Sequence, residues 1–206
     1  GREVVPERTV SGDAVVGERV RNPVTGDAVL LLPAGFVDPE NATGVVMSVP
    51  AHSPDDYLAL RAVAADAATL TAFDIDPTSV EAIEPVPILE VPGYGRVPAR
   101  DAVEEAGIER ADDPALAAVT KELYADEFHQ GRLDAMYGER AGALVEEVRE
   151  PYRDALIADG AAETLYEFTE EVVCRCGGEV IVADQETWFL RYDAADWKER
   201  THTLVD

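Results

Sequence analysis

A predicted strand passes into a predicted helix in the segment Gly44-Val45-Val46-Met47-Ser48-Val49-Pro50-Ala51-His52-Ser53-Pro54-Asp55-Asp56-Tyr57. Its first part, residues 44–49, is mostly apolar without clean alternation, which favours a strand covered on both faces. Serine is a preferred N-cap, proline suits the first helical position and acidic residues complement the helix dipole. These residues predict a helix that starts after Ser53 and runs to about Ala67.

Strand patterns occupy both ends of the chain and helical patterns its middle. Valine-rich residues 1–50 are interrupted by turn residues, and 28–32 reads as a second buried strand. Prolines leave room for one or two short strands near 86–90. Apolar spacing predicts helices at 99–106, 113–130, 139–158 and 161–168, and Gly177-Gly178 predicts a hairpin turn between strands at 171–173 and 179–182. We therefore expect a mixed α/β fold.

The composition describes a globular and strongly acidic protein. Of 206 residues 47% are hydrophobic, and 42 acidic residues against 17 basic ones give a formal charge of −25. Concentrated salt screens such repulsion, so we expect a halophilic source; the alternative, an acidic disordered segment, conflicts with the apolar content. No membrane span or signal peptide is evident, which predicts a cytoplasmic protein. The acidity by itself argues against a nucleic-acid partner.

Standard catalytic and metal-binding motifs are absent. The chain has no P-loop, dinucleotide-binding glycine pattern, Gly-x-Ser-x-Gly elbow or zinc helix. Cys174 and Cys176 have a spacing that we judge poorly suited to a mutual disulfide, and no second Cys/His pair completes a zinc site. His129 and His202 are expected to be structural or surface residues. We predict no metal site.

Asp56 has two alternative interpretations. It lies three residues after Ser53, where a carboxylate can complete a capping-box-like arrangement and complement the helix dipole. Alternatively, the small, polar and titratable residues of this strand, loop and helix start form an active-site loop. The residues alone leave both interpretations open.

The same segment resembles the editing-site motif of leucyl-tRNA synthetases, in which Gly-Thr-Gly, Met, His and an Asp before Tyr follow in this order. The corresponding residues here are Ala42-Thr43-Gly44, Met47, His52 and Asp56-Tyr57. Further stretches that resemble the archaeal form of these enzymes are Asn22-Pro23-Val24-Thr25-Gly26, Pro33-Ala34-Gly35-Phe36-Val37-Asp38, Glu127-Phe128-His129-Gln130-Gly131 and Gln185-Glu186-Thr187-Trp188-Phe189-Leu190. The resemblance covers nearly the whole chain.

The resemblance implies a β-barrel-like editing core of a class I synthetase with a helical insertion. Its expected parts are an editing core with the motif loop at 1–83, a strand plus helical insertion at 84–170, and returning strands that lead to the catalytic core at 171–206. Two departures are visible: Ala42 replaces the first glycine, and the family's threonine-rich strand, one wall of the pocket, is missing from this chain.

The implied activity is hydrolysis of mischarged tRNA(Leu). A hydrophobic pocket gains only about 1–3 kcal/mol per methylene, so a second, hydrolytic site improves discrimination. By resemblance, Asp56 and Thr43 are catalytic, with Asp56 binding the substrate ammonium, while Gly44, Met47 and His52 complete the binding site. The implied partners are the tRNA(Leu) 3′ end and the synthetase's catalytic core, and ATP and magnesium serve only the full-length enzyme. The alternative is a non-catalytic tRNA-binding or structural fragment.

Overall fold

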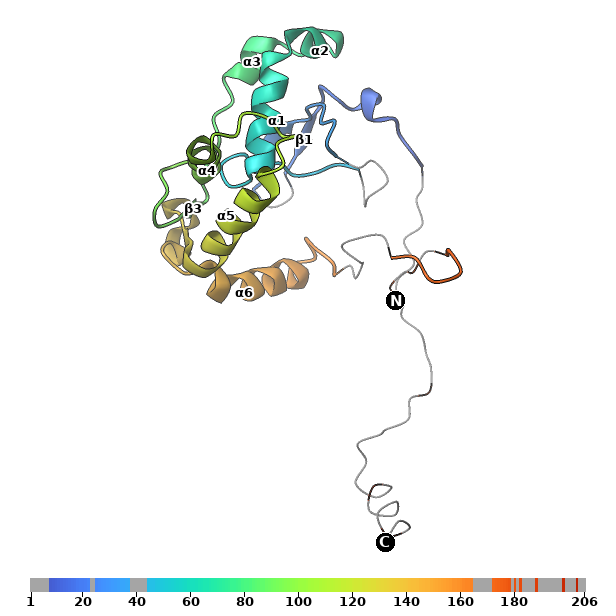
Figure 1. Cartoon of the computed structure of the whole chain (residues 1–206), viewed down its shortest axis with the longest axis vertical. Helices are drawn as coiled ribbons and strands as arrows, with labels where there is room; N and C mark the ends of the chain where they lie inside the picture. The colour runs from blue at the N-terminus through green and yellow to red at the C-terminus, as the bar shows by residue number, and fades with distance from the viewer. Residues whose placement is uncertain are drawn as a thin grey trace. The chain divides into compact units, whose positions relative to one another are not determined.

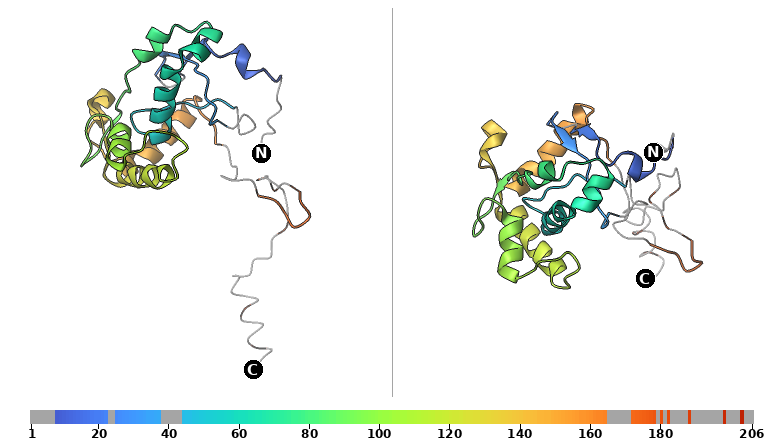
Figure 2. Two further views of the ribbon diagram at one scale, coloured as in Figure 1. Left: turned by 45° about the horizontal axis from the view of Figure 1, so that its top comes forward. Right: turned by 90° about the horizontal axis from the view of Figure 1, so that it is seen from above.

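The computed structural model describes residues 8–22, 25–37, 44–164 and 172–178 and the single positions 180, 182, 188, 198 and 203. The chain divides into two compact units, one of residues 9–163 and the other of residues 1–8 with 164–206. The predicted motif loop lies in the first of these units, whose elements are shown in Figures 1 and 2. The described residues are mixed α and β, as predicted.

Two short antiparallel strand pairs are present in unit 9–163. Strand β1 (Arg19–Arg21) follows a 3₁₀ turn, η1 (Gly12–Ala14), and pairs with β2 (Ala28–Leu30). Strand β3 (Leu89–Glu90) pairs with β4 (Arg132–Leu133). The predicted strands near 28–32 and 86–90 are thus present, although both are shorter than expected. The expectation that the first of them is buried was wrong, because Ala28 is exposed and Val29 and Leu30 are half-buried.

The predicted buried strand at residues 44–49 is not found. The segment carries no strand pairing among the described residues, and Val45, Val46 and Met47 are each more than half exposed. A strand needs a neighbour to receive its backbone hydrogen bonds and to cover its side chains. No described strand lies beside residues 44–49 to provide these hydrogen bonds or to cover the side chains. The apolar segment therefore lies at the surface, although its composition is typical of a core strand.

Three consecutive helices each begin directly after a residue whose side chain caps them. Helix α1 (Pro54–Ala65) starts after Ser53, as predicted, and ends two residues before the predicted end. Asp66 there caps α2 (Ala67–Ala72), and Asp76 caps α3 (Pro77–Glu81). The three helices surround a buried cluster of Leu70, Ile75 and Val80, against which Leu30 and Leu32 of the β2 region also pack.

Helix α1 also packs on α4 (Pro98–Ala106) and α5 (Leu116–Gln130), which contact each other. Leu58 of α1, Val103 of α4 and Leu116 of α5 share one buried cluster. After β4, the chain forms a kinked 3₁₀ segment, η2 (Ala135–Arg140), and α6 (Val145–Ala158), which packs on α5. Figure 1 shows α6 beside the end of α5. Of the four helices predicted between residues 99 and 168, three are therefore present. In the fourth, at 161–168, residues 161–164 are not helical and the rest lie outside the described residues.

The described part of the other unit contains the predicted hairpin turn. The Val180 N–H donates to the Val172 carbonyl at 2.8 Å, and the Cys174 N–H donates to the Gly178 carbonyl at 2.8 Å. Cys174 and Cys176 form a disulfide, so the expectation that their spacing is poorly suited to one was wrong. Residues 174–177 form a turn in which the Gly177 N–H donates to the Cys174 carbonyl at 2.8 Å, and the two cysteine Cα atoms lie 5.3 Å apart, within bridging range.

None of the described helices combines the length and the apolar character that a membrane span requires.

Candidate functional site

The Asp56 carboxylate closes a loop at the start of α1. Its Oδ2 accepts a hydrogen bond from the Val49 N–H at 2.7 Å, and its own N–H donates to Ser53 Oγ at 3.2 Å. The Val49 carbonyl accepts from the N–H groups of His52 and Ser53 at 2.8 and 2.9 Å. These four hydrogen bonds join residues 49–56 into one closed loop. Asp56 is buried, with 6% of its surface exposed.

This arrangement contains only half of the expected capping box. The serine caps the N–H of the residue three positions on, as such a box requires. The Asp56 carboxylate, however, reaches past Ser53 to Val49, because the Ser53 N–H is already bonded to the Val49 carbonyl. The carboxylate is therefore a clamp between the helix and the segment that precedes it. Among the described residues no donor reaches the other oxygen, Oδ1.

His52 points into the protein and is 4% exposed. Its Nε2 lies 2.9 Å from the Ile88 nitrogen and 3.3 Å from the Leu89 nitrogen, and its Nδ1 lies 2.7 Å from Glu127 Oε1. Backbone N–H groups can only donate, so Nε2 is the acceptor and Nδ1 carries the proton. We expected this side chain to line the pocket; the structure gives both ring nitrogens protein partners.

A further contact joins the loop to α4. The Ala99 N–H, in the first turn of α4, donates to the Ala51 carbonyl at 3.0 Å. The loop of residues 49–53 is therefore held by α1 through Asp56, by α4 through Ala99, by α5 through Glu127 and by the start of β3 through Ile88 and Leu89. Four separate elements fix its position.

The other predicted site residues are less closely integrated. Gly44 has a φ of 66°, a conformation that favours glycine, and begins the exposed segment that leads to Val49. Met47 is 51% exposed, and its sulfur lies 4.0 Å from the Asn22 side-chain nitrogen. Thr43 lies outside the described residues. The structure thus brings Asp56 and His52 into one loop, with Gly44 and Met47 on the segment before it.

The other two histidines differ from His52. His129, in the last turn of α5, has a 64% exposed side chain whose Nδ1 lies 3.3 Å from Glu146 Oε2. His202 lies outside the described residues. In the described part of the chain, no three His, Cys, Asp or Glu side chains are grouped to hold a metal ion.

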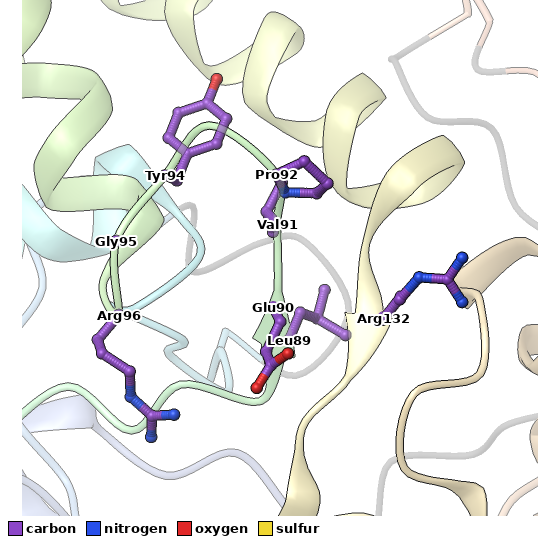
Figure 3. A pocket seen from close by; sticks show the side chains of 8 residues that line it. All are labelled: Leu89, Glu90, Val91, Pro92, Tyr94, Gly95, Arg96 and Arg132. Carbon is purple, nitrogen blue, oxygen red and sulfur yellow. The ribbon is translucent and has the colours of Figure 1, made fainter.

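A surface pocket of about 460 Å³ lies beside β3 (Figure 3). Its lining combines apolar residues with charged ones, namely Leu89, Glu90, Val91, Pro92, Tyr94, Gly95, Arg96 and Arg132. Arg96 is paired with Asp134 at 3.1 Å. None of the predicted site residues lines this pocket, but Leu89 connects it to the loop because its N–H donates to His52.

Sequence reasoning missed two partners that organise the loop. The first is the Val49 N–H, a backbone group that every residue except proline carries, so the residue type at position 49 does not indicate it. Glu127 was part of the Glu-Phe-His-Gln-Gly stretch that carried the family resemblance, but it had no assigned role. Its position in α5 on the apolar side of the helix, next to Leu123, was the one available indication of burial.

The sequence of this chain is similar to part of several known proteins. The leucine–tRNA ligase of Methanopyrus kandleri is 47% identical over 199 residues, which are 96% of this chain and 21% of that protein. That of Pyrococcus horikoshii is 39% identical over 208 residues, which are 100% of this chain and 21% of that protein. The chain matches leucyl-tRNA synthetases. It spans about a fifth of their length, and no protein-family model matches it.

Solved structures show which part of the synthetases is matched. The crystal structure of GlLeuRS-CP1 is 26% identical, with a TM-score of 0.69 over 79% of this chain and 63% of that one. The editing domain of the P. knowlesi cytosolic leucyl-tRNA synthetase, at 20% identity, has the same fold, with a TM-score of 0.65 over 74% of this chain and 52% of that one. The chain therefore shares the fold of the CP1 and editing domains of leucyl-tRNA synthetases.

Proposed function

We propose that this chain is the post-transfer editing segment of a leucyl-tRNA synthetase and that it hydrolyses the ester of mischarged tRNA(Leu). The observation that carries the proposal is the Asp56 carboxylate, which is held in place through Oδ2 while no described donor occupies Oδ1. An aminoacyl ester retains a free α-ammonium group. A fixed carboxylate next to an exposed apolar segment is suited to bind such a group together with its side chain.

In this proposal Asp56 positions the ester and water is the nucleophile. A charge-assisted hydrogen bond from the ammonium group to Asp56 orients the ester carbonyl carbon toward the attacking water. Positioning and preorganised polar groups then account for most of the reduction in the activation barrier. Thr43 and Gly44 contact the ribose or the carbonyl, and Met47 contacts the amino-acid side chain. His52 does not contact the substrate through its ring nitrogens, since both already have protein partners, and it contributes by holding the loop in place.

The remaining features of the proposal follow from the family. The editing segment itself uses no cofactor, whereas ATP and magnesium serve the aminoacylation site of the full-length enzyme. Its partners are the tRNA(Leu) 3′ end and the catalytic core, in the cytoplasm and away from membranes. The exposed segment 44–49 contributes to a barrel-like core, which would cover Val45 and Val46. The acid excess suits a halophilic source.

The test compares Asp56→Asn with Asp56→Ala in a full-length synthetase that contains this chain. Asparagine can still accept the Val49 hydrogen bond through its oxygen but has no charge for the ammonium, whereas alanine loses both. We expect both variants to lose deacylation of Ile-tRNA(Leu) and to retain leucylation. Ser53→Ala is the matched control, because it removes a helix cap and leaves the carboxylate.

The alternative, a non-catalytic tRNA-binding or structural role, makes the opposite prediction. Under that alternative Asp56→Asn deacylates Ile-tRNA(Leu) at the wild-type rate, since the loop geometry is preserved. Normal editing by the asparagine variant would therefore refute the assignment of Asp56 as the ammonium-binding group.

A further inference from the structure

Glu127 is a buried carboxylate for which the proposed chemistry has no direct use. It lies near the end of α5, is 8% exposed, and its Oε1 is 2.7 Å from His52 Nδ1. Charged carboxylates are seldom buried without a specific partner, because removal from water is costly. Among the described residues this ring nitrogen is the side-chain partner of Glu127, so the contribution of Glu127 to the site passes through His52.

The hydrogen bond determines which form the imidazole takes. A carboxylate accepts, so it selects the tautomer with the proton on Nδ1 and leaves Nε2 unprotonated. Only an unprotonated Nε2 can accept the N–H groups of Ile88 and Leu89. With the proton on Nε2 instead, N–H would face N–H and the link to β3 would be lost. Glu127 thus decides whether His52 can join the loop to the strand.

The backbone at the end of α5 is packed to hold Glu127 in place. The Gly131 N–H donates to the Glu127 carbonyl at 3.0 Å. A Cβ added to Gly131 would lie 2.2 Å from that carbonyl oxygen, much closer than contact distance. A side chain at position 131 would therefore displace the last turn of α5, and with it the carboxylate that faces His52.

The position of Asp56 depends on the same loop. The Val49 carbonyl is bonded to the His52 N–H, and the Val49 N–H is bonded to the Asp56 carboxylate. A shift of His52 is therefore transmitted to Asp56 through one residue. We infer that Glu127 is a positioning residue for editing: through the His52 tautomer, it sets the place of the Asp56 carboxylate. This inference rests on the proposed function.

The test uses Glu127→Gln and Glu127→Ala in the full-length synthetase, with Glu122→Ala, an exposed residue of the same helix, as the control. Glutamine retains an acceptor for Nδ1–H, while alanine leaves the ring without one. We expect Glu127→Ala to lower kcat for deacylation on the order of 100-fold, the cost of a displacement of about 1 Å at reacting groups. KM and leucylation should change little. Glu127→Gln and Glu122→Ala should behave like wild type.

A second measurement reads the tautomer without any activity. The chain has three histidines, so ¹⁵N-histidine labelling of the 206-residue protein gives few signals, and His52→Gln identifies that of His52. We expect the proton on Nδ1 in the wild type and in Glu127→Gln. If Glu127→Ala fails to fold, the glutamine variant and this spectrum still decide the question.

Three results would overturn the inference: a proton on Nε2 in the wild type, normal editing by Glu127→Ala, or an editing loss in Glu127→Gln as large as in Glu127→Ala. Failure of the proposed function has a different pattern. In that case the wild-type synthetase does not deacylate Ile-tRNA(Leu), or Asp56→Asn edits normally, while the tautomer is still the one that Glu127 selects.

Discussion

Removing the Asp56 carboxylate should weaken the folded state as well as editing, by an amount that the structure allows us to estimate. A hydrogen bond to a charged acceptor contributes about 1.5–3 kcal/mol, and a carboxylate in the first helical turn adds about 0.3–1 kcal/mol. Val49 is 40% exposed, so its freed N–H can bond to water and the first term falls at the low end. We expect Asp56→Ala to lower the free energy of unfolding by about 2 kcal/mol.

Asp56→Asn provides the comparison, because it keeps a neutral acceptor for the Val49 N–H and should lose only about 1 kcal/mol. Ser53→Ala should also lose about 1 kcal/mol, the usual cost of removing an N-cap. The measurement is urea unfolding in concentrated potassium chloride, read as the shift in midpoint at constant slope. The reasoning about the clamp is refuted if Asp56→Ala unfolds at the wild-type midpoint, or if Asp56→Asn is equally destabilised.

Two further predictions concern charge. With 42 acidic residues against 17 basic ones, the melting temperature should rise between about 0.1 M and about 1 M potassium chloride, as the screening length falls from about 10 to about 3 Å; an unchanged melt would contradict this. The Thr69 hydroxyl and N–H bond to Asp66 and lower its pKa. The stability that Asp66 contributes is thus present above the ordinary aspartate pKa and lost as pH falls through the lowered folded value. In Asp66→Asn the melting temperature should therefore fall less steeply as the pH is lowered below the ordinary aspartate pKa. The same fall in melting temperature as in the wild type would show that the charge of Asp66 contributes nothing to stability.

The sequence predicted the local features of this fold well. The start of α1 follows from Ser53 and Pro54, because capping and the fixed φ of proline act within one turn. The left-handed end of α4 at Gly107 is equally local. The presence of His52 and Asp56 in one loop was also predictable, since the two residues lie four positions apart in one motif.

Features that depend on distant segments were not predicted. Residues 44–49 have the composition of a core strand, but composition does not say whether a partner strand is available. The partner of His52 is 75 residues away in the chain, and no local pattern indicates such a pairing. The Cys174–Cys176 disulfide lies within a tight turn of residues 174–177, which a rule based on spacing alone overlooks.

Strand β3 is only two residues long, and it meets its partner β4 after two intervening helices. Such a short ladder has little stability of its own. Its pairing, like the bond from Ile88 to His52, joins segments that lie far apart in the chain, so the entropy of loop closure must be overcome before either contact forms. We therefore expect helices α1, α4 and α5 to form early and the candidate site to assemble late in folding. A nascent chain with helical structure alone would not yet hold Asp56 in place.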